Sequence, residues 1–307
     1  MVSRILSILA VAFSVACGGL ALAAESKDED TKQLPPAHKL DIRPNKKAKW
    51  DAPLQNVEKL LYSGAGELWC YFPGRRLPPI LVEPKGGPIV LFRRGPDGEL
   101  YVRLSTGGTL WAQYTYQFAH EFCHILCSFD GDENPNKWFE ESLCETASLF
   151  VLRRMSETWK TAPPYPNWRD FTPHLLDYAQ KRIADAQLPE GQTLADWYKH
   201  NAKELHGKAL CEESCVIGAA LLPLLEEDPK HWEAVAWLNA GRPYKNQTFE
   251  AYLTDWRYYA PDRHKPFIEK IAKQFDITLP PTSRQELPEK QAEKQQGTKE
   301  EAAALGP

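Results

Sequence analysis

Residues 120–124 read His-Glu-Phe-Cys-His, and residues 138–145 read Trp-Phe-Glu-Glu-Ser-Leu-Cys-Glu. In a helix that turns by about 100° per residue, His120 and His124 lie about 40° apart on one face and can bind one metal ion together. The apolar side chains of the same stretch fall on the opposite side of the wheel: Phe118, Phe122, Ile125, Leu126 and Phe129. The pattern predicts a helix over 111–128 that carries the imidazoles on the floor of a cleft.

A second helical pattern opens with Glu141, and sixteen residues separate it from His124. Two His and one Glu around Zn²⁺, with the fourth position left to water, form a catalytic zinc arrangement. Glu145 follows Glu141 by one turn, where it can accept a hydrogen bond that fixes a ligand imidazole. Glu121, between the two histidines in sequence, is the expected general base. The alternative is a chance match on an ordinary amphipathic helix.

The two stretches resemble the gluzincin metallopeptidases of the thermolysin and zinc aminopeptidase type, in which a Glu on the next helix follows the His-Glu-x-x-His pentapeptide. Residues 138–145 are similar to the Trp-Leu-Asn-Glu-Gly-Phe-Ala-Glu segment of the aminopeptidase branch, and the likeness covers roughly residues 80–155. It implies that His120, His124 and Glu141 bind the zinc and that Glu121 is the base. Glu140 stands where those enzymes commonly have Asn, and their Gly-x-Met-x-Asn motif does not precede the pentapeptide. Because Glu140 lies 100° around the helix from Glu141, its replacement is expected to have little effect on metal binding.

The rest of the chain predicts an α+β fold, with a zincin-like lobe of a small sheet and the His-Glu-x-x-His helix at 51–160 and an all-helical lobe at 161–278. The first lobe is expected to have a helix at 53–62 and strands at 79–83, 88–93 and 99–105. Helices of the second lobe are expected at 172–187, 193–206, 209–227, 230–239, 247–258 and 263–275. Residues 25–50 read as a linker, and 279–307, rich in Pro, Glu, Lys and Gln, as a disordered tail.

The first 24 residues have the layout of a secretory signal peptide, with Arg4 before an apolar run and Ala21-Leu22-Ala23 before the acidic stretch. A secreted, periplasmic or cell-envelope protein is expected. Two alternatives are a lipoprotein anchored at Cys17, because residues 14–17 form an imperfect lipobox, and an uncleaved membrane anchor over residues 5–24. Membrane attachment is expected only in those two cases.

Charge argues against nucleic acid as a partner. Loss of Arg4 with the signal takes the net charge from −4 to −5, and the only basic cluster is Lys46, Lys47 and Lys49.

Cleavage of the signal would leave six cysteines: Cys70, Cys123, Cys127, Cys144, Cys211 and Cys215. On the helical wheel Cys123 and Cys127 flank the histidine face, so a disulfide from either one to Cys144 would tie the two ligand helices together. The alternative is that all three are small residues where the helices approach closely. A cysteine ligand would instead close the zinc site and leave Glu121 no water to activate.

A tetrahedral oxyanion needs a hydrogen-bond donor besides the metal, and the candidates are Tyr178, Tyr198, His200 and His206. His174 and His231 are expected to be ordinary surface residues.

Three functions follow from the sequence. The first is a secreted zinc peptidase acting on a peptide or protein. The second is a peptidase fold that has lost catalysis and works as a binding module. The third is a tethering role for the linker and tail at the envelope.

Overall fold

A small mixed sheet forms from the first half of the chain, whose computed structural model describes residues 38–129, 134–207 and 212–281. Its strands are β1 (Ile42–Pro44), β2 (Ile80–Glu83), β3 (Ile89–Leu91) and β4 (Leu100–Arg103). They lie in the order β1-β2-β4-β3, with β1, β2 and β4 parallel and β3 antiparallel to β4, where Val90 pairs with Val102. Alternate residues of β2 and β4 are buried, as a sheet with one face on the core requires.

Three long helices pack beside this sheet: α1 (Leu54–Trp69), α2 (Trp111–Leu126) and α3 (Lys137–Thr158). Helix α1 contacts β1 and α2 contacts β3, while α3 packs most extensively against α2 and α6 (Glu212–Glu227). Arg75 caps the end of α2 by donating to the carbonyls of Leu126 at 2.6 Å and Ile125 at 3.4 Å, the latter of which also accepts from the backbone amide of Ser128.

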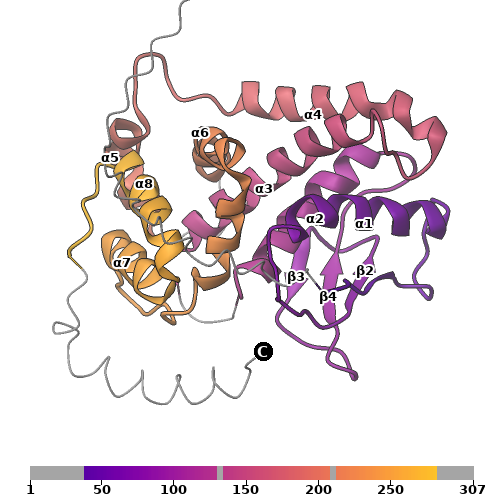
Figure 1. Cartoon of the computed structure of the whole chain (residues 1–307), viewed down its shortest axis with the longest axis horizontal. Coiled ribbons are helices and arrows are strands. Elements are labelled where there is room, and N and C mark those ends of the chain that lie inside the picture. The colour runs from indigo at the N-terminus through magenta and orange to yellow at the C-terminus, as the bar shows by residue number, and fades with distance from the viewer. Residues whose placement is uncertain (1–37, 130–133, 208–211, 282–307) are drawn as a thin grey trace, which may run out of the picture. The chain divides into compact units, whose positions relative to one another are not determined.

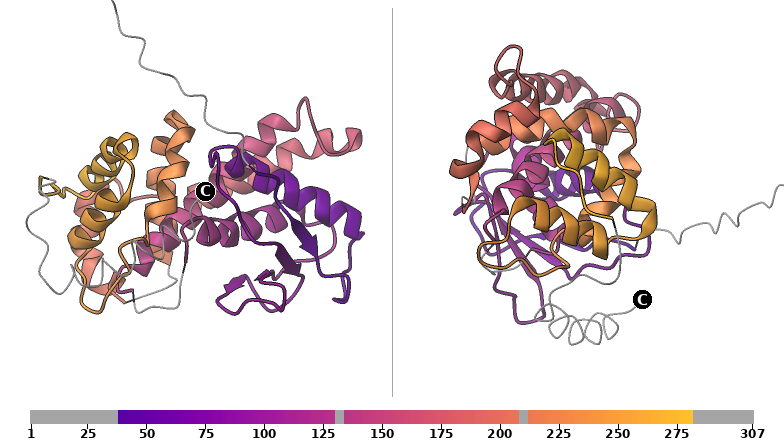
Figure 2. Two further views of the ribbon diagram at one scale, coloured as in Figure 1. Left: turned by 60° about the horizontal axis from the view of Figure 1, so that its bottom comes forward. Right: turned by 90° about the vertical axis from the view of Figure 1, so that its left-hand side faces the viewer.

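The remaining helices lie on the other side of α3 from the sheet or along its far end (Figures 1 and 2). They are η1 (Pro166–Phe171), α4 (Thr172–Asp185), α5 (Leu194–Leu205), η2 (Pro229–Trp237), α7 (Phe249–Tyr259), η3 (Asp262–His264) and α8 (Lys265–Gln274). Hydroxyls fix two of the starts, since Thr193 accepts from the Asp196 amide at 3.1 Å and Thr248 from the Ala251 amide at 3.2 Å. The α+β class is confirmed, whereas the zincin topology stays a prediction.

Several predicted boundaries differ from the observed ones. Strand β1 lies inside the predicted linker at 25–50, and α1 continues to Trp69 rather than ending at residue 62. The helix predicted at 230–239 is a 3₁₀ helix that begins with Pro229. Leu279, expected to begin the tail, is buried in the core. Strand β1 has only three residues, with prolines and lysines nearby, which is too short a run to predict a strand from sequence. It is recognised only because it pairs with the neighbouring β2.

Some expectations fall outside the described residues: the signal peptide, the lipobox at Cys17, the first half of the linker (25–37), Cys211 and the tail from 282 onward. All described residues belong to one compact unit, and the two-lobe division near residue 160 stays a prediction. Across the described ranges, no helix combines the length and the apolar character that a membrane crossing needs.

Helices α3 and α6 touch where Gly218 stands. A Cβ at that position would lie 2.8 Å from Cβ of Glu145 and 2.9 Å from the carbonyl oxygen of Ser142, and the Gly218 carbonyl accepts from Oγ1 of Thr146 at 3.0 Å. The absence of a side chain therefore lets α6 approach the segment of α3 that carries the expected metal site.

We expect Gly218→Ala to lower the free energy of unfolding by about 1–3 kcal/mol, because α6 must move away from α3. Denaturant unfolding measures the change. Gly66→Ala in α1 is the matched control, since its added Cβ meets nothing within 4 Å and should raise stability by up to about 1 kcal/mol through helix propensity. Equal effects of the two substitutions would contradict this account of the contact.

Candidate metal site

The two histidines lie in the seam between α2 and α3, which run antiparallel: His120 faces Glu141 and Glu145, whereas His124 faces Glu140 and Glu141. Both imidazoles are only 6% exposed. The ligand face of α2 is thus covered by α3, which differs from the open cleft floor that the wheel predicted. The wheel describes one helix alone and cannot show what packs against its polar face.

One carboxylate oxygen connects the two imidazoles. Oε2 of Glu141 lies 3.0 Å from Nε2 of His120 and 3.3 Å from Nε2 of His124. Two ligand atoms that each bind a tetrahedral Zn²⁺ at about 2.0–2.1 Å are about 3.3 Å apart. The Glu141 oxygen therefore lies at about the separation from each Nε2 atom that a shared ion would require.

The opposite nitrogens of both rings face further carboxylates. Nδ1 of His124 lies 2.6 Å from Oε1 of Glu140, and Nδ1 of His120 lies 3.4 Å from Oε1 of Glu145. A carboxylate on Nδ1 fixes the ring orientation and leaves Nε2 as the metal-binding atom. Glu145 occupies the place expected for it from the sequence.

Glu140 corrects the sequence-based expectation that it contributes little, which rested on its position 100° around the helix from Glu141. It is 3% exposed and makes the shortest of these contacts, to His124. The error arises because a single helical wheel omits the second helix. Helix α2 runs antiparallel to α3, with His124 one turn from His120, so the adjacent residues Glu140 and Glu141 can contact different rings.

Sequence reasoning also missed two residues that hold these carboxylates. The hydroxyl of Tyr116 donates to Glu145, and Nδ2 of Asn239 donates to Oε2 of Glu140 at 2.8 Å. Tyr116 lies one turn before His120, a spacing that could have drawn attention to it. Asn239, which follows η2, is almost a hundred residues from Glu140 in the sequence, and no local sequence pattern indicates its contact with the site.

The charges of the site favour a cation. Burial alone lowers the pKa of His120, but its contacts with Glu141 and Glu145 outweigh burial and raise that pKa to about 9. His124 behaves alike, with its pKa raised well above the usual value by Glu140 and Glu141. Burial opposes ionisation of Glu141, yet the two imidazoles lower its pKa to about 2. Three carboxylates thus surround a place where either two protons or one divalent ion can supply positive charge.

Glu121 lies on α2 together with the two histidines and is 4% exposed. Burial raises the pKa of its carboxyl, against the lowering influence of His120, His124 and a hydrogen bond from the backbone of Val90 in β3. A raised carboxyl pKa suits a group that must accept and return a proton near neutral pH.

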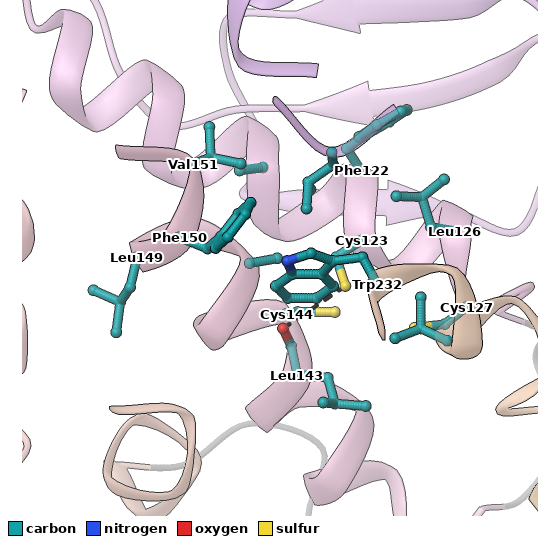
Figure 3. Packing of buried hydrophobic residues seen from close by; sticks show 14 of the residues in the cluster. Phe122, Cys123, Leu126, Cys127, Leu143, Cys144, Leu149, Phe150, Val151 and Trp232 are labelled. Carbon is teal, nitrogen blue, oxygen red and sulfur yellow. Dashed lines mark hydrogen bonds between the residues drawn. The ribbon is translucent and has the colours of Figure 1, made fainter. Parts of the chain in front are cut away.

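Three buried thiols lie on the core side of the same seam. Cys123, Cys127 and Cys144 are free, and Figure 3 shows them beside Trp232 with the sulfurs of Cys123 and Cys144 near each other. The disulfide considered from the sequence is therefore not formed in this structure. The small-residue interpretation of all three agrees with their complete burial.

Cys144 is a competing third ligand, because its sulfur and one nitrogen of each histidine all lie within 4.8 Å of one another. Burial raises the pKa of this thiol well above its usual value, but a bound metal ion would deprotonate it, so the shift does not decide between the two ligands. The Glu141 oxygen lies 3.0 Å and 3.3 Å from the two Nε2 atoms. On these distances we propose Glu141 as the third ligand.

The candidate oxyanion donors have other contacts. Tyr198 stacks on Trp138 at 5.6 Å, Tyr178 meets the ring of Tyr116 at 5.7 Å, and the His200 ring bonds the carbonyl of Asp196 at 2.7 Å. His206 ends α5. No donor role follows from these contacts.

The two histidines expected to be ordinary surface residues pack on aromatic rings, since His231 stacks on Phe267 at 4.3 Å and His174 contacts Phe171 at 5.0 Å.

Glu140→Gln should weaken zinc binding by about 10- to 100-fold, because it replaces the anionic acceptor on Nδ1 of His124 with a neutral amide. Competition against a chromophoric chelator measures the affinity. Glu157→Gln is the control, since that residue lies on the same helix but pairs with exposed Lys160. An affinity unchanged by Glu140→Gln would remove this residue from the site.

Zinc binding at pH 7 should release protons. The pKa of His120 is about 9 without metal, so its ring is protonated at pH 7 and must lose that proton to bind the ion. Affinity should therefore fall as the pH falls below 9. Calorimetric titrations in buffers of different ionisation enthalpy count the released protons, and a buffer-independent heat would contradict the charge state.

Comparison of the chain with protein-family models, with curated proteins and with solved structures finds no match.

Proposed function

We propose that this protein is a zinc-dependent peptidase, exported from the cytoplasm, in which His120, His124 and Glu141 hold the ion. The observation that carries the proposal is the single Glu141 oxygen at 3.0 and 3.3 Å from the two Nε2 atoms, while both Nδ1 atoms face carboxylates. Two nitrogens and one oxygen leave a tetrahedral position for water, which is the donor set of catalytic zinc sites. Export rests on the sequence of residues 1–24 alone.

An extended peptide is the substrate class that the surroundings favour. Strand β3 forms an edge of the described sheet and contacts α2, and the backbone of Val90 lies against Glu121. An edge strand can bind an extended peptide through main-chain hydrogen bonds. Ile89 and Phe92, which are 44% and 53% exposed, offer apolar surface on the same segment.

The chemistry assigned to the chain's own residues is simple. Zinc, when bound, supplies a Lewis acid that polarises the scissile carbonyl and acidifies water. Glu121 accepts the proton of the attacking water and returns it to the leaving amine. Glu140 and Glu145 keep the two rings oriented, so that both Nε2 atoms point to one place.

We expect close to one zinc per chain, and we expect Glu121→Gln to retain that zinc while losing activity. The substitution preserves size and removes the proton acceptor, so cleavage of a peptide library should fall by 10² to 10⁴, about 3–5 kcal/mol of barrier. Elemental analysis, thermal unfolding and mass spectrometry of the cleaved library provide the three measurements.

Each outcome assigns a function. Absence of zinc in the parent, with no uptake on titration, would end the proposal. Chelator-resistant cleavage, or equal cleavage by parent and variant, would exclude the mechanism. Zinc in the parent without cleavage of any peptide would favour the binding module, and capture of a partner by the Glu121→Gln variant would then be the next experiment.

A further inference from the structure

A chain of buried hydrogen bonds runs from the C-terminal helices to His124. The hydroxyl of Tyr252, in α7, donates to Oδ1 of Asn239 at 2.7 Å. Nδ2 of Asn239 donates to Oε2 of Glu140 at 2.8 Å, and Oε1 of Glu140 lies 2.6 Å from Nδ1 of His124. These four side chains are at most 7% exposed.

Asn239 holds both helices of the metal site at once. Its Nδ2 also donates to the carbonyl of Cys127 at 3.1 Å, at the end of α2, while it bonds Glu140 on α3. An amide has two N–H donors, so both bonds can form together. The Cys127 carbonyl and the Glu140 carboxylate can only accept, so they fix the side of the amide that carries nitrogen, and the Tyr252 hydroxyl then donates to Oδ1.

We propose that Asn239 and Tyr252 are positioning residues that set the zinc affinity of His124 through Glu140. Glu140 has one oxygen for the imidazole and one for Asn239, so its orientation is fixed only while both are in place. Loss of the Asn239 bond frees the carboxylate to rotate, and His124 then loses the acceptor that directs its Nε2 to the ion. The proposal depends on the metal site but not on peptidase activity.

Binding linkage makes the effect reciprocal: if the docked α7 strengthens zinc binding, zinc must stabilise the docking of α7 by the same factor. A purely structural asparagine would lack this property. It would hold α7 in place equally well with and without the ion.

The test compares two isosteric substitutions that each remove an amide donor. Asn239→Asp keeps the acceptor for Tyr252 but places an oxygen against Glu140. Asn136→Asp is the matched control, because Asn136 is 1% exposed and its Nδ2 donates at 2.8 Å to the carbonyl of Gln247, which belongs to the same C-terminal part but does not touch the ligands. Tyr252→Phe provides a milder third variant.

We expect Asn239→Asp to weaken zinc binding about tenfold, the lower end of the effect known for groups that orient ligands, and Tyr252→Phe to weaken it several-fold. Asn136→Asp should lose stability but keep the parental affinity, measured by chelator competition at a temperature where all variants are folded. The Nδ1 proton resonance of His124 should move in Asn239→Asp and stay in Asn136→Asp. Hydrogen exchange in α7 should slow on zinc addition in the parent and not in Asn239→Asp.

Equal affinities of Asn239→Asp and the parent would overturn the inference, as would equal losses in the two aspartate variants, which would indicate a general effect of destabilisation. A parent that binds no zinc overturns both the inference and the proposed function. A parent that binds zinc but cleaves nothing overturns only the latter.

Discussion

The structure depends on keeping five ionisable side chains buried between α2 and α3. Two imidazoles and three carboxylates lie in one seam: His120, His124, Glu140 and Glu141 are at most 6% exposed, and the side chain of Glu145 is 13% exposed. A buried charge costs several kcal/mol unless partners satisfy it, and removal of one partner is expensive because the other charge remains. Each carboxylate of the seam accordingly has a partner: Glu141 both Nε2 atoms, Glu140 a ring and Asn239, Glu145 a ring and Tyr116. The stability of the fold must therefore come from apolar packing elsewhere. The seam instead fixes the relative positions of the ionisable side chains.

That geometry sets how the rest of the chain is arranged. Helix α3 is buried on nearly all sides, which is typical of a helix at the centre of a layered fold rather than of an amphipathic surface helix. Helix α6 approaches it at Gly218 beside Glu145, and the loop after η2 approaches it at Glu140. Elements from the C-terminal half therefore surround a candidate site whose proposed ligands all come from residues 120–145.

The sequence predicted what local spacing controls. The helix over 111–128, the three expected strands, and the approach of Glu141 and Glu145 to the histidines follow from periods of 3.6 and 2 and from one motif, whereas the ligand set stays a prediction. Glu140 was misjudged because the wheel of α3 shows no neighbour, and only the antiparallel packing of α2 brings His124 to it. Asn239 could not be predicted for a related reason, because it bonds Glu140 across about a hundred residues and no periodicity reveals such a contact. Tyr252 is only 13 residues from its partner Asn239, but its relation to the site depends on that same long-range contact. Strand β1 lacks the length from which a strand can be recognised.

Glu121 separates a catalytic from a purely structural metal site. The ligands and their carboxylate partners already satisfy every ring nitrogen of His120 and His124, so a structural ion would need nothing from Glu121. Burial nevertheless raises the pKa of the Glu121 carboxyl, because burial disfavours its ionised form. A purely structural metal site would gain nothing from this cost. The hydrogen bond from Val90 joins α2 to β3 and would explain a neutral amide at this position equally well. A carboxylate where an amide would serve the packing as well agrees with the proton transfer proposed for Glu121.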